Sequence, residues 1–393
     1  MEKIIFTEEF CQPQKLFPFT LTRHVVDIRV GILTIREKWE AYLGLPSFNK
    51  WLDNYKDNSF SIKTSELSPG EYLLIHSNVL PSAKIISQIK KLNPGELLLC
   101  AVNGPVALKF SNKDASANDV KVSKTILLEE DAKTISQPWH IFQMNDWAIR
   151  EDFHLLTNGR TSEPISSTNK TIAPENIFIE QGAKLEHCIL NASTGPIYIG
   201  KNAEIMEGSI IRGPLAMCEG AVLKLGTKVY GATTLGPYSV GGGEIKNSVF
   251  FGYSNKGHDG YLGDSVIGEW CNMGAGTSNS NVKNNAGAVK VYSDLEKNTY
   301  ETAGIKCGVL MGDYSRSAIN TSFNTGTVVG VSVNIFGSGL TPKYVPSFSW
   351  GSEGIKTYNF DAALQHIENW KQLKHQTLTA EEKSILKYLY ENQ

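Results

Sequence analysis

The sequence of 393 residues has six cysteines but no two of them in a CxxC spacing. They are scattered as Cys11, Cys100, Cys188, Cys218, Cys271 and Cys307. This distribution indicates neither a zinc site nor a disulfide framework. Unpaired thiols favour a reducing compartment.

A long apolar run is also missing. No stretch approaches the roughly twenty apolar residues of a membrane span, and the opening MEKIIFTEEF lacks the apolar core of a signal peptide. Charge of one sign does not dominate, since 38 Lys and Arg oppose 40 Asp and Glu. This balance argues against binding to nucleic acid or a membrane surface through a basic field. We therefore expect a soluble cytoplasmic protein, in which any phosphate would be bound by a few positively charged residues and not by a broad basic surface.

What the sequence does contain is a period of six residues. Aliphatic side chains recur at Ile199, Ile205, Ile211, Met217, Leu223, Val229 and Leu235. Four residues after each of them the side chain is small in six of seven cases. The period fits neither the helical repeat near 3.6 nor the strand repeat of 2. It predicts a parallel β-helix, in which each hexad supplies one short strand and one turn and several coils stack to bury a shared core.

Three parts follow from the patterning along the chain. Residues 1–165 alternate strand-like stretches (4–6, 72–75 and 97–102) with helical ones (30–43 and 82–92), which predicts an α/β domain with a largely parallel sheet. The polar segment 157–171 reads as a linker. Residues 166–345 carry the hexads, and residues 346–393 form a helical tail.

The hexads break after Gly276, where the alternation in 289–304 predicts a projecting hairpin. A second set of hexads then runs from Met311 to Ile335, and the β-helix should end near Phe336. In the tail, Asp361 is the expected cap of one helix. Thr379 and Glu382 form a capping box ahead of a second helix.

One segment of the β-helix carries candidate chemistry. With three hexads per coil, stacked positions are eighteen residues apart, so His258 should lie below Gly276 in the turn 274–276 and Lys228 beneath Lys246. A histidine beside exposed backbone amides supplies a base and an oxyanion donor for acyl transfer. Two stacked lysines favour a phosphate between them. From spacing alone, a turn histidine and two solvated surface lysines remain alternative readings.

The run EIKNSVFFGYSNKGHDGYLGDSVIGEWCNMGAGTSNSN, residues 244–281, resembles the acetyltransferase domain of the bifunctional GlmU enzymes. That family carries GHxxYLGD, NIGAGT and CNYDG at matching separations. The resemblance implies a left-handed β-helix with His258 as general base and the Ala275 amide as oxyanion donor. It also implies that glucosamine 1-phosphate is held by Lys246, Tyr261, Asn272 and Asn281.

Two positions depart from the family pattern. Lys228 stands where the family has a phosphate-binding arginine, which keeps the charge but loses the bidentate fork. Val282 stands where a tyrosine contacts the substrate, so the acceptor need not be glucosamine 1-phosphate.

Residues 11–39 resemble the opening of sugar-nucleotide pyrophosphorylases. The stretch 16–20 (LFPFT) matches their LxPLT element, whereas residues 12–15 (QPQK) replace the glycine-rich loop whose amides cradle a triphosphate. The resemblance implies Lys15 and Arg23 as phosphate contacts, with Arg29 weaker, and ordinary surface charges are the alternative. No magnesium ligand is identified; Asp27 and Asp146 are the only candidates.

The leading functional hypothesis is a bifunctional, homotrimeric enzyme of UDP-N-acetylglucosamine biosynthesis. The resemblance implies acetyl transfer from acetyl-CoA to the amine of glucosamine 1-phosphate or a related amino-sugar phosphate, and uridylyl transfer from UTP with Mg²⁺ in the N-terminal domain. The alternatives are an acetyltransferase with a non-catalytic sugar-nucleotide-binding front domain, or a non-catalytic trimeric scaffold. A carbonic anhydrase of the β-helix type is disfavoured, because only His187 and His258 lie among the hexads.

Overall fold

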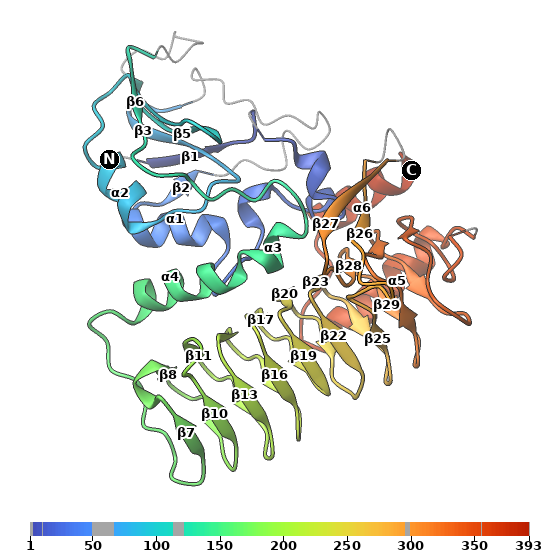
Figure 1. Cartoon of the computed structure of the whole chain (residues 1–393). Helices are drawn as coiled ribbons and strands as arrows, with labels where there is room; N and C mark the ends of the chain where they lie inside the picture. Colours follow the sequence, from blue (N-terminus) through green and yellow to red (C-terminus); the bar gives the residue numbers. More distant parts are fainter. Residues whose placement is uncertain are drawn as a thin grey trace. The chain divides into compact units, whose positions relative to one another are not determined.

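The computed structural model describes residues 3–9, 11–48, 67–112, 122–294, 299–354 and 356–392 (Figure 1). The chain divides into two compact units. Unit 1 comprises Met1–Pro13, Arg23–Ile28 and Leu33–Ser136, and unit 2 comprises Gln14–Thr22, Arg29–Ile32 and Gln137–Gln393. Two short N-terminal segments thus belong to unit 2. The domain boundaries at 165 and 345 stay predictions.

Unit 1 is a six-stranded mixed sheet. Its strands lie in the order β2 (Ser47–Phe48), β1 (Lys3–Thr7), β3 (Gly70–His76), β5 (Gly104–Asn112), β4 (Glu96–Cys100) and β6 (Lys124–Leu127). β1 is parallel to β2 and β3, and β4 to β6, whereas β5 is antiparallel to both of its neighbours. The sheet is therefore less parallel than predicted, because residues 101–103 form a turn too short for a crossover.

Two α-helices accompany this sheet, α1 (Ile35–Leu43) and α2 (Ala83–Ile89). α1 begins five residues later than predicted because Thr34 and Glu37 form a capping box at its N-terminus. Three 3₁₀ turns, η1 (Pro13–Leu16), η2 (Phe19–Leu21) and η3 (Val25–Asp27), precede it. The α/β class predicted for this part of the chain is confirmed.

Unit 2 contains a parallel β-helix whose coils each pass through three sheets. The first sheet comprises β7 (Lys170–Ile172), β10 (Ile189–Asn191), β13 (Ile210–Arg212), β16 (Lys228–Tyr230), β19 (Glu244–Lys246) and β22 (Tyr261–Gly263). The second comprises β8 (Ile177–Ile179), β11 (Ile197–Ile199), β14 (Leu215–Met217), β17 (Thr233–Leu235), β20 (Val249–Gly252), β23 (Val266–Glu269), β28 (Leu310–Met311), β31 (Val328–Val329) and β33 (Tyr344–Val345). The third comprises β9 (Lys184–Leu185), β12 (Glu204–Ile205), β15 (Val222–Leu223), β18 (Val240–Gly241), β21 (Asn255–Lys256), β24 (Asn272–Met273), β29 (Arg316–Ser317) and β32 (Asn334–Ile335).

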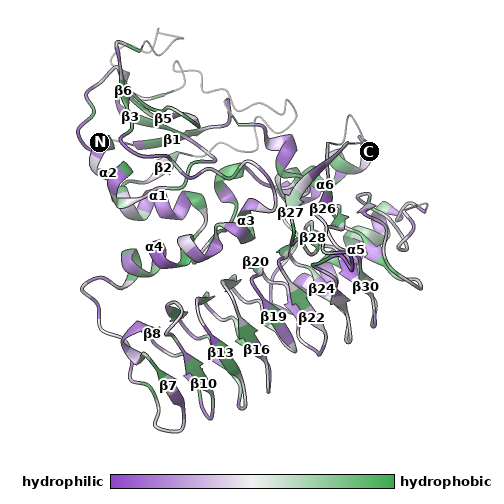
Figure 2. Cartoon of the chain, in the orientation of Figure 1, coloured by the Kyte–Doolittle hydropathy of each residue, from purple (hydrophilic) through white to green (hydrophobic). Residues whose placement is uncertain are grey.

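The predicted stripe forms the core of this β-helix. All seven aliphatic residues of the six-residue period are at most 1% exposed, and they belong to one continuous apolar cluster. Apolar segments recur from strand to strand in Figure 2. Because each coil exposes its inner face until a neighbour covers it, burial depends on stacking. The hexad interpretation is confirmed.

Coil length is not constant. Val222 pairs with Val240 eighteen residues later, but Val240 pairs with Asn255 after fifteen, and Asn255 pairs with Asn272 after seventeen. In the first sheet, Lys228 pairs with Glu244 after sixteen. The uniform spacing of eighteen residues is therefore wrong for the coils that carry the candidate site, and also at the start of the β-helix, where Ile189 pairs with Ile210 after twenty-one residues.

The predicted hairpin is present as β26 (Val289–Asp294) and β27 (Thr299–Gly304), an antiparallel pair. On either side of it the coil continues, since β25 (Ser278–Asn279) pairs in parallel with β30 (Ser322–Phe323). The second hexad set from Met311 to Ile335 is buried as predicted. Strand pairing extends beyond Phe336 to β33.

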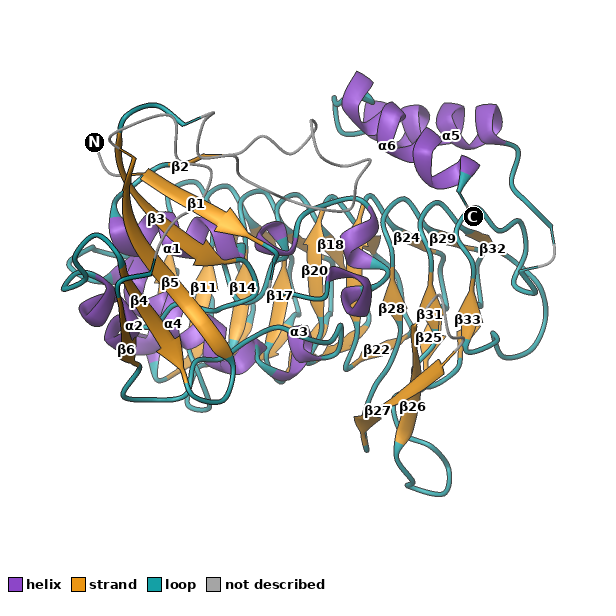
Figure 3. Cartoon of the chain, turned by 90° about the horizontal axis from the view of Figure 1, so that it is seen from above, coloured by secondary structure: helices purple, strands orange, loops and turns teal. Residues whose placement is uncertain are grey.

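Helices cover parts of unit 2. α3 (His140–Gln143) and α4 (Asn145–Thr157) precede the β-helix, and η6 (Pro174–Asn176) lies in its first coil. The tail forms α5 (Phe360–Gln372) and α6 (Ala380–Glu391), which lie beside β24, β29 and β32 (Figure 3). The α6 capping box is confirmed, but α5 is capped by Asn359 and not by Asp361.

Candidate functional site

His258 lies at the corner between β21 of the third sheet and β22 of the first. The next coil turns the same corner at Ala275, seventeen residues later. This offset holds throughout the corner, because the amide of Gly276 donates to the carbonyl oxygen of Asp259 at 3.0 Å. His258 therefore stacks beside Ala275, and not below Gly276 as the predicted spacing of eighteen residues required.

A glycine lets the two coils approach here. Gly260 has a φ of +122°, and a Cβ at this position would lie 2.1 Å from the carbonyl oxygen of Thr277. The backbone amide of Ala275 donates to no acceptor among the described residues, although the amides of Gly274, Gly276 and Thr277 around it all do. The imidazole of His258 is exposed. A base thus stands beside an unused N–H donor, which is the pair of groups that acyl transfer requires.

Lys256 also belongs to this corner, and it was not predicted from the sequence. It occupies an inward position of the third sheet and is 1% exposed. Its ammonium donates to the carbonyl oxygens of Gly242 at 3.0 Å and His258 at 2.8 Å. Burial lowers its pKa to about 8. Lys256 occupies the inward position that Leu223 and Gly241 occupy in the two preceding coils. A lysine at an inward position is a signal, but it can be recognised only once the coil lengths are known.

This buried ammonium makes the stability of unit 2 depend on pH. Between pH 8 and pH 10.5 the folded Lys256 has lost its proton while the unfolded chain still holds it, so the free energy of unfolding rises with pH. A pKa lowered from 10.5 to about 8 corresponds to ~3 kcal/mol. We expect the stability of the wild type, measured relative to Lys256→Met by urea unfolding, to increase by about this amount across that window. A difference that stays constant from pH 7 to pH 10.5 would contradict the assignment.

The outer face of the first sheet carries most of the other predicted residues. The prediction that Lys228 lies beneath Lys246 is wrong, because Lys228 pairs with Glu244 and Lys246 pairs with Tyr230. The shorter coil displaces the two lysines by two residues along the strand, so they are diagonal neighbours on the same face. Lys246 Nζ lies 5.7 Å from the ring centroid of Tyr230.

Tyr261 and Asn281, which the resemblance places in one site, are in contact. The side-chain amide of Asn281 donates to the Tyr261 hydroxyl at 3.1 Å and to Asp264 Oδ2 at 2.5 Å. Asn247 donates to the other oxygen of Asp264 at 2.7 Å. Burial is the largest cause that raises the pKa of Tyr261, and the Asp264 carboxylate adds to it. Tyr261 therefore stays protonated and can donate a hydrogen bond.

Two more groups complete the surroundings. Tyr230 donates to Glu244 Oε1 at 2.6 Å, and this bond is the main reason that its pKa rises to about 12. Asn272 lies across the corner on the outer face of the third sheet, paired with Asn255 on one side and Arg316 on the other. Asn272 and Tyr261 thus lie on either side of the corner that carries His258, whereas Lys246 ends β19 and Asn281 contacts Asp264, just after β22, toward the other end of the first sheet.

Unit 1 has a separate hollow at the carboxyl ends of β1 and β3. It is lined by Phe6, Glu8, His24, Val26, Arg36, Phe48 and Ser77. Carboxyl ends of parallel strands are the usual ligand sites of α/β sheets. Next to Ser77, burial lowers the pKa of His76 to about 4, so this imidazole is neutral at pH 7.

The charged groups of this hollow were not predicted. Glu8 accepts a hydrogen bond from the Val25 amide at 2.7 Å and lies 3.4 Å from His24 Nδ1. Arg36 forms a two-bond pair with Asp27 at 2.6 and 3.0 Å. Only the fold brings each of these two pairs together, and the spacing of the residues along the chain did not indicate the contacts.

The predicted nucleotide contacts lie elsewhere. Lys15 is exposed in unit 2 and Arg23 belongs to unit 1, and neither lines the hollow. Arg29 is structural: it is 8% exposed and its Nε donates to the Phe251 carbonyl oxygen at 3.0 Å. Both magnesium candidates are paired with arginines, Asp27 with Arg36 and Asp146 with Arg150. The described residues contain no group of three or more His, Cys, Asp or Glu side chains placed to hold a metal ion.

Comparison with known proteins finds similarity to nucleotidyl transferases and to acetyltransferases. Residues 4–161 match the family model of sugar nucleotidyl transferases. Over 313 residues the chain is 27% identical to a bifunctional sugar-1-phosphate nucleotidylyltransferase/acetyltransferase of Sulfurisphaera tokodaii, covering 78% of this chain and 69% of that protein. It is 35% identical over 104 residues to the bifunctional protein GlmU of Methanocaldococcus jannaschii, which is 26% of this chain and 25% of that protein. The chain is thus similar to a bifunctional nucleotidylyltransferase/acetyltransferase over most of its length and to GlmU proteins over part of it.

A solved structure, the polySia-specific acetyltransferase NeuO, matches 49% of this chain and 79% of its own at 12% identity and a TM-score of 0.23. Among the described residues, none of the helices combines the length and the apolar character needed to cross a bilayer. The resemblance to the bifunctional GlmU enzymes and the fold class expected from the sequence are confirmed. The individual site residues stay predictions.

Proposed function

We propose that unit 2 transfers an acetyl group from acetyl-CoA to the amine of glucosamine 1-phosphate or a related amino-sugar phosphate at the corner of His258 and Ala275. The observation that carries this proposal is the stacking of an exposed imidazole beside a backbone N–H that has no acceptor among the described residues. The S. tokodaii relative, whose name includes both activities, supports it.

In the proposed reaction, His258 removes a proton from the sugar amine as the nitrogen attacks the thioester carbonyl carbon. A C–N bond forms, and the negative charge that develops on the carbonyl oxygen is stabilised by the Ala275 N–H. The C–S bond then breaks, and the thiolate of coenzyme A leaves and takes up the proton from the imidazolium. A positioned base contributes about 10²- to 10⁴-fold to such a step, and an oxyanion donor about 10²- to 10³-fold.

The sugar phosphate would lie on the first sheet. Lys246 and Lys228 supply positive charge for the phosphate, and the Tyr261 hydroxyl and the Asn281 amide supply hydrogen bonds to the sugar. Asn272 would approach from the third sheet. Because the resemblance implies sites between neighbouring chains, we propose a homotrimer, and we propose the cytoplasm as its location.

For the N-terminal part we propose uridylyl transfer from UTP to the sugar 1-phosphate, giving UDP-N-acetylglucosamine or a related nucleotide. The match to sugar nucleotidyl transferases supports this. Magnesium usually binds through one or two carboxylates together with substrate phosphates, so it would enter with UTP. We assign it no protein ligand, because Asp27 is already paired with Arg36.

One observation favours a second candidate, an acetyltransferase with a binding module in front. The segment 12–15, which replaces the glycine-rich loop, overlaps η1, whose Leu16 is buried. A 3₁₀ turn with a proline exposes fewer amides to a triphosphate than a glycine-rich loop.

A substrate panel on the full-length protein tests both activities. Glucosamine 1-phosphate with acetyl-CoA should release coenzyme A, and N-acetylglucosamine 1-phosphate with UTP and Mg²⁺ should release pyrophosphate. Release of coenzyme A without pyrophosphate would favour the second candidate. Release of neither, with galactosamine 1-phosphate also inactive, would leave the scaffold hypothesis.

A further inference from the structure

A buried arginine without a counterion lies near the end of the β-helix. Arg316 points outward from β29, yet it is only 9% exposed. Its guanidinium carbon lies 5.4 Å from the ring centroid of Trp370 in α5. Nε and Nη2 are buried without a hydrogen-bond partner, and no carboxylate of the described residues forms an ion pair with Arg316. The charge is therefore enclosed but unpaired.

Such an arrangement is costly unless something else binds there. Burial lowers the pKa of Arg316 to about 10, which leaves the guanidinium charged at pH 7. An enclosed charge needs a counterion or hydrogen bonds to offset the loss of water. The cation–π contact with Trp370 contributes only about 0.5–2 kcal/mol. Two carboxylates of the tail are engaged elsewhere: Glu382 accepts from Lys371 at 2.6 Å, and Glu368 from the Leu378 amide at 2.9 Å.

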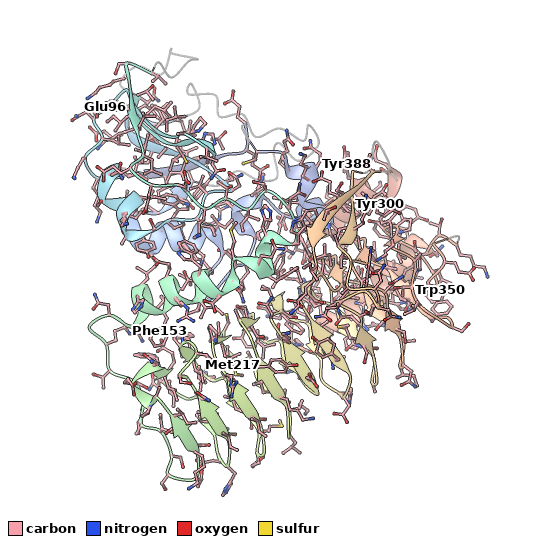
Figure 4. All side chains as sticks on the ribbon, viewed as in Figure 1. Glu96, Phe153, Met217, Tyr300, Trp350 and Tyr388 are labelled. Carbon is pink, nitrogen blue, oxygen red and sulfur yellow. The ribbon has the colours of Figure 1, made fainter. Side chains whose placement is uncertain are left out.

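The neighbours of Arg316 are suited to an anion. Asn272 and Asn334 are its backbone partners on the two adjacent strands, so amide, guanidinium and amide form one outward-facing row. Neither asparagine side chain forms a hydrogen bond within the described residues. Beyond Asn334, the ring of Trp350 is 37% exposed at the same end of unit 2 (Figure 4). The row offers N–H donors and no acidic group.

We propose that Arg316, flanked by Asn272 and Asn334, binds the phosphate group of a small-molecule ligand beneath α5. A planar guanidinium donates two parallel hydrogen bonds to phosphate oxygens, which lysine cannot do. Coenzyme A, a sugar nucleotide and free phosphate all carry this chemistry. This site shares Asn272 with the proposed acetyl-transfer site, but the inference does not rest on that reaction, because its test measures binding and not turnover.

Binding to the full-length protein can be measured by calorimetry with inorganic phosphate, coenzyme A and UDP-N-acetylglucosamine as separate probes. At least one probe should bind, and Arg316→Met should weaken it by about 10- to 100-fold, the range expected for a lost hydrogen bond to a charged group. Lys201→Met, which removes an exposed charge from the same β-helix, should change the affinity less than twofold. The probe that binds most tightly identifies the source of the phosphate.

Thermal unfolding supplies an independent readout. Without ligand, Arg316→Met should be at least as stable as the wild type, because it removes an enclosed unpaired charge. With ligand, only the wild type and Lys201→Met should gain stability. Equal binding to wild type and Arg316→Met, or no binding of any probe to the wild type, would overturn the proposal. If Arg316→Met does not fold, Arg316→Lys replaces it, and unchanged affinity in that variant would overturn the proposal equally.

Discussion

Replacing His258 by alanine should lower acetyl transfer by about 10²- to 10⁴-fold, the contribution of a positioned general base. The loss should appear in kcat, because the imidazole acts on the proton that moves in the transition state. Folding should be unaffected, since His258 is exposed and its imidazole has no hydrogen bond within the described part of the chain. The measurement is release of coenzyme A at saturating substrate, together with a thermal unfolding curve.

His187 provides a matched control. It lies at the same corner of an earlier coil, between β9 and β10, and is exposed. His187 has a φ of +55°, so asparagine, which tolerates the left-handed region, is the replacement to use. His187→Asn should retain full activity. Substantial acetyl transfer by His258→Ala would remove His258 from the mechanism, whatever the outcome for uridylyl transfer.

Replacing Phe250 by alanine should destabilise unit 2 by about 3–5 kcal/mol, the usual cost of removing a buried phenylalanine. Phe250 is fully buried in β20, where it pairs with Leu235 in the preceding coil and Ile267 in the following one. The stacked coils cannot collapse into the cavity without breaking their strand pairing. The change can be followed by urea unfolding with circular dichroism, in the transition that belongs to unit 2.

Leu225→Ala is the control for this substitution. Leu225 lies in the same β-helix but is 68% exposed, so its loss should change stability by less than about 0.5 kcal/mol. An effect below about 1 kcal/mol for Phe250→Ala would mean that the stacked core is looser than these coils indicate.

Much of the β-helix could be predicted, because its signal is local. Each hexad places one aliphatic residue inward regardless of what the distant chain does, and the column from Ile199 to Leu235 is buried as expected. The hairpin between 289 and 304 and the capping box of α6 were also predictable, since alternation and capping involve residues close in sequence. The GHxxYLGD-like motif indicated which corner of the β-helix carries the candidate site. The six-residue period alone does not indicate this.

The register of the coils could not be predicted in the same way. A coil may omit a residue at a corner and still point its next aliphatic side chain inward, so the pattern does not reveal the omission. This is why Lys228 meets Glu244 instead of Lys246, and why His258 meets Ala275 instead of Gly276. The nucleotide contacts stay predictions, because Lys15 lies in a segment that belongs to unit 2 and Arg23 in one that belongs to unit 1.

The amino-acid sequence by itself determined that this chain coils, which residues face the core, and which motif carries a histidine and an exposed amide. Inward and outward orientation depends on side-chain polarity within a few residues, and sequence records it directly. Only the tertiary structure decided which residues of successive coils lie side by side. It alone placed the Lys256 ammonium against the carbonyl of Gly242, 14 positions earlier, and enclosed Arg316 beneath Trp370, 54 positions later. These contacts depend on coil lengths and on where the tail helix packs.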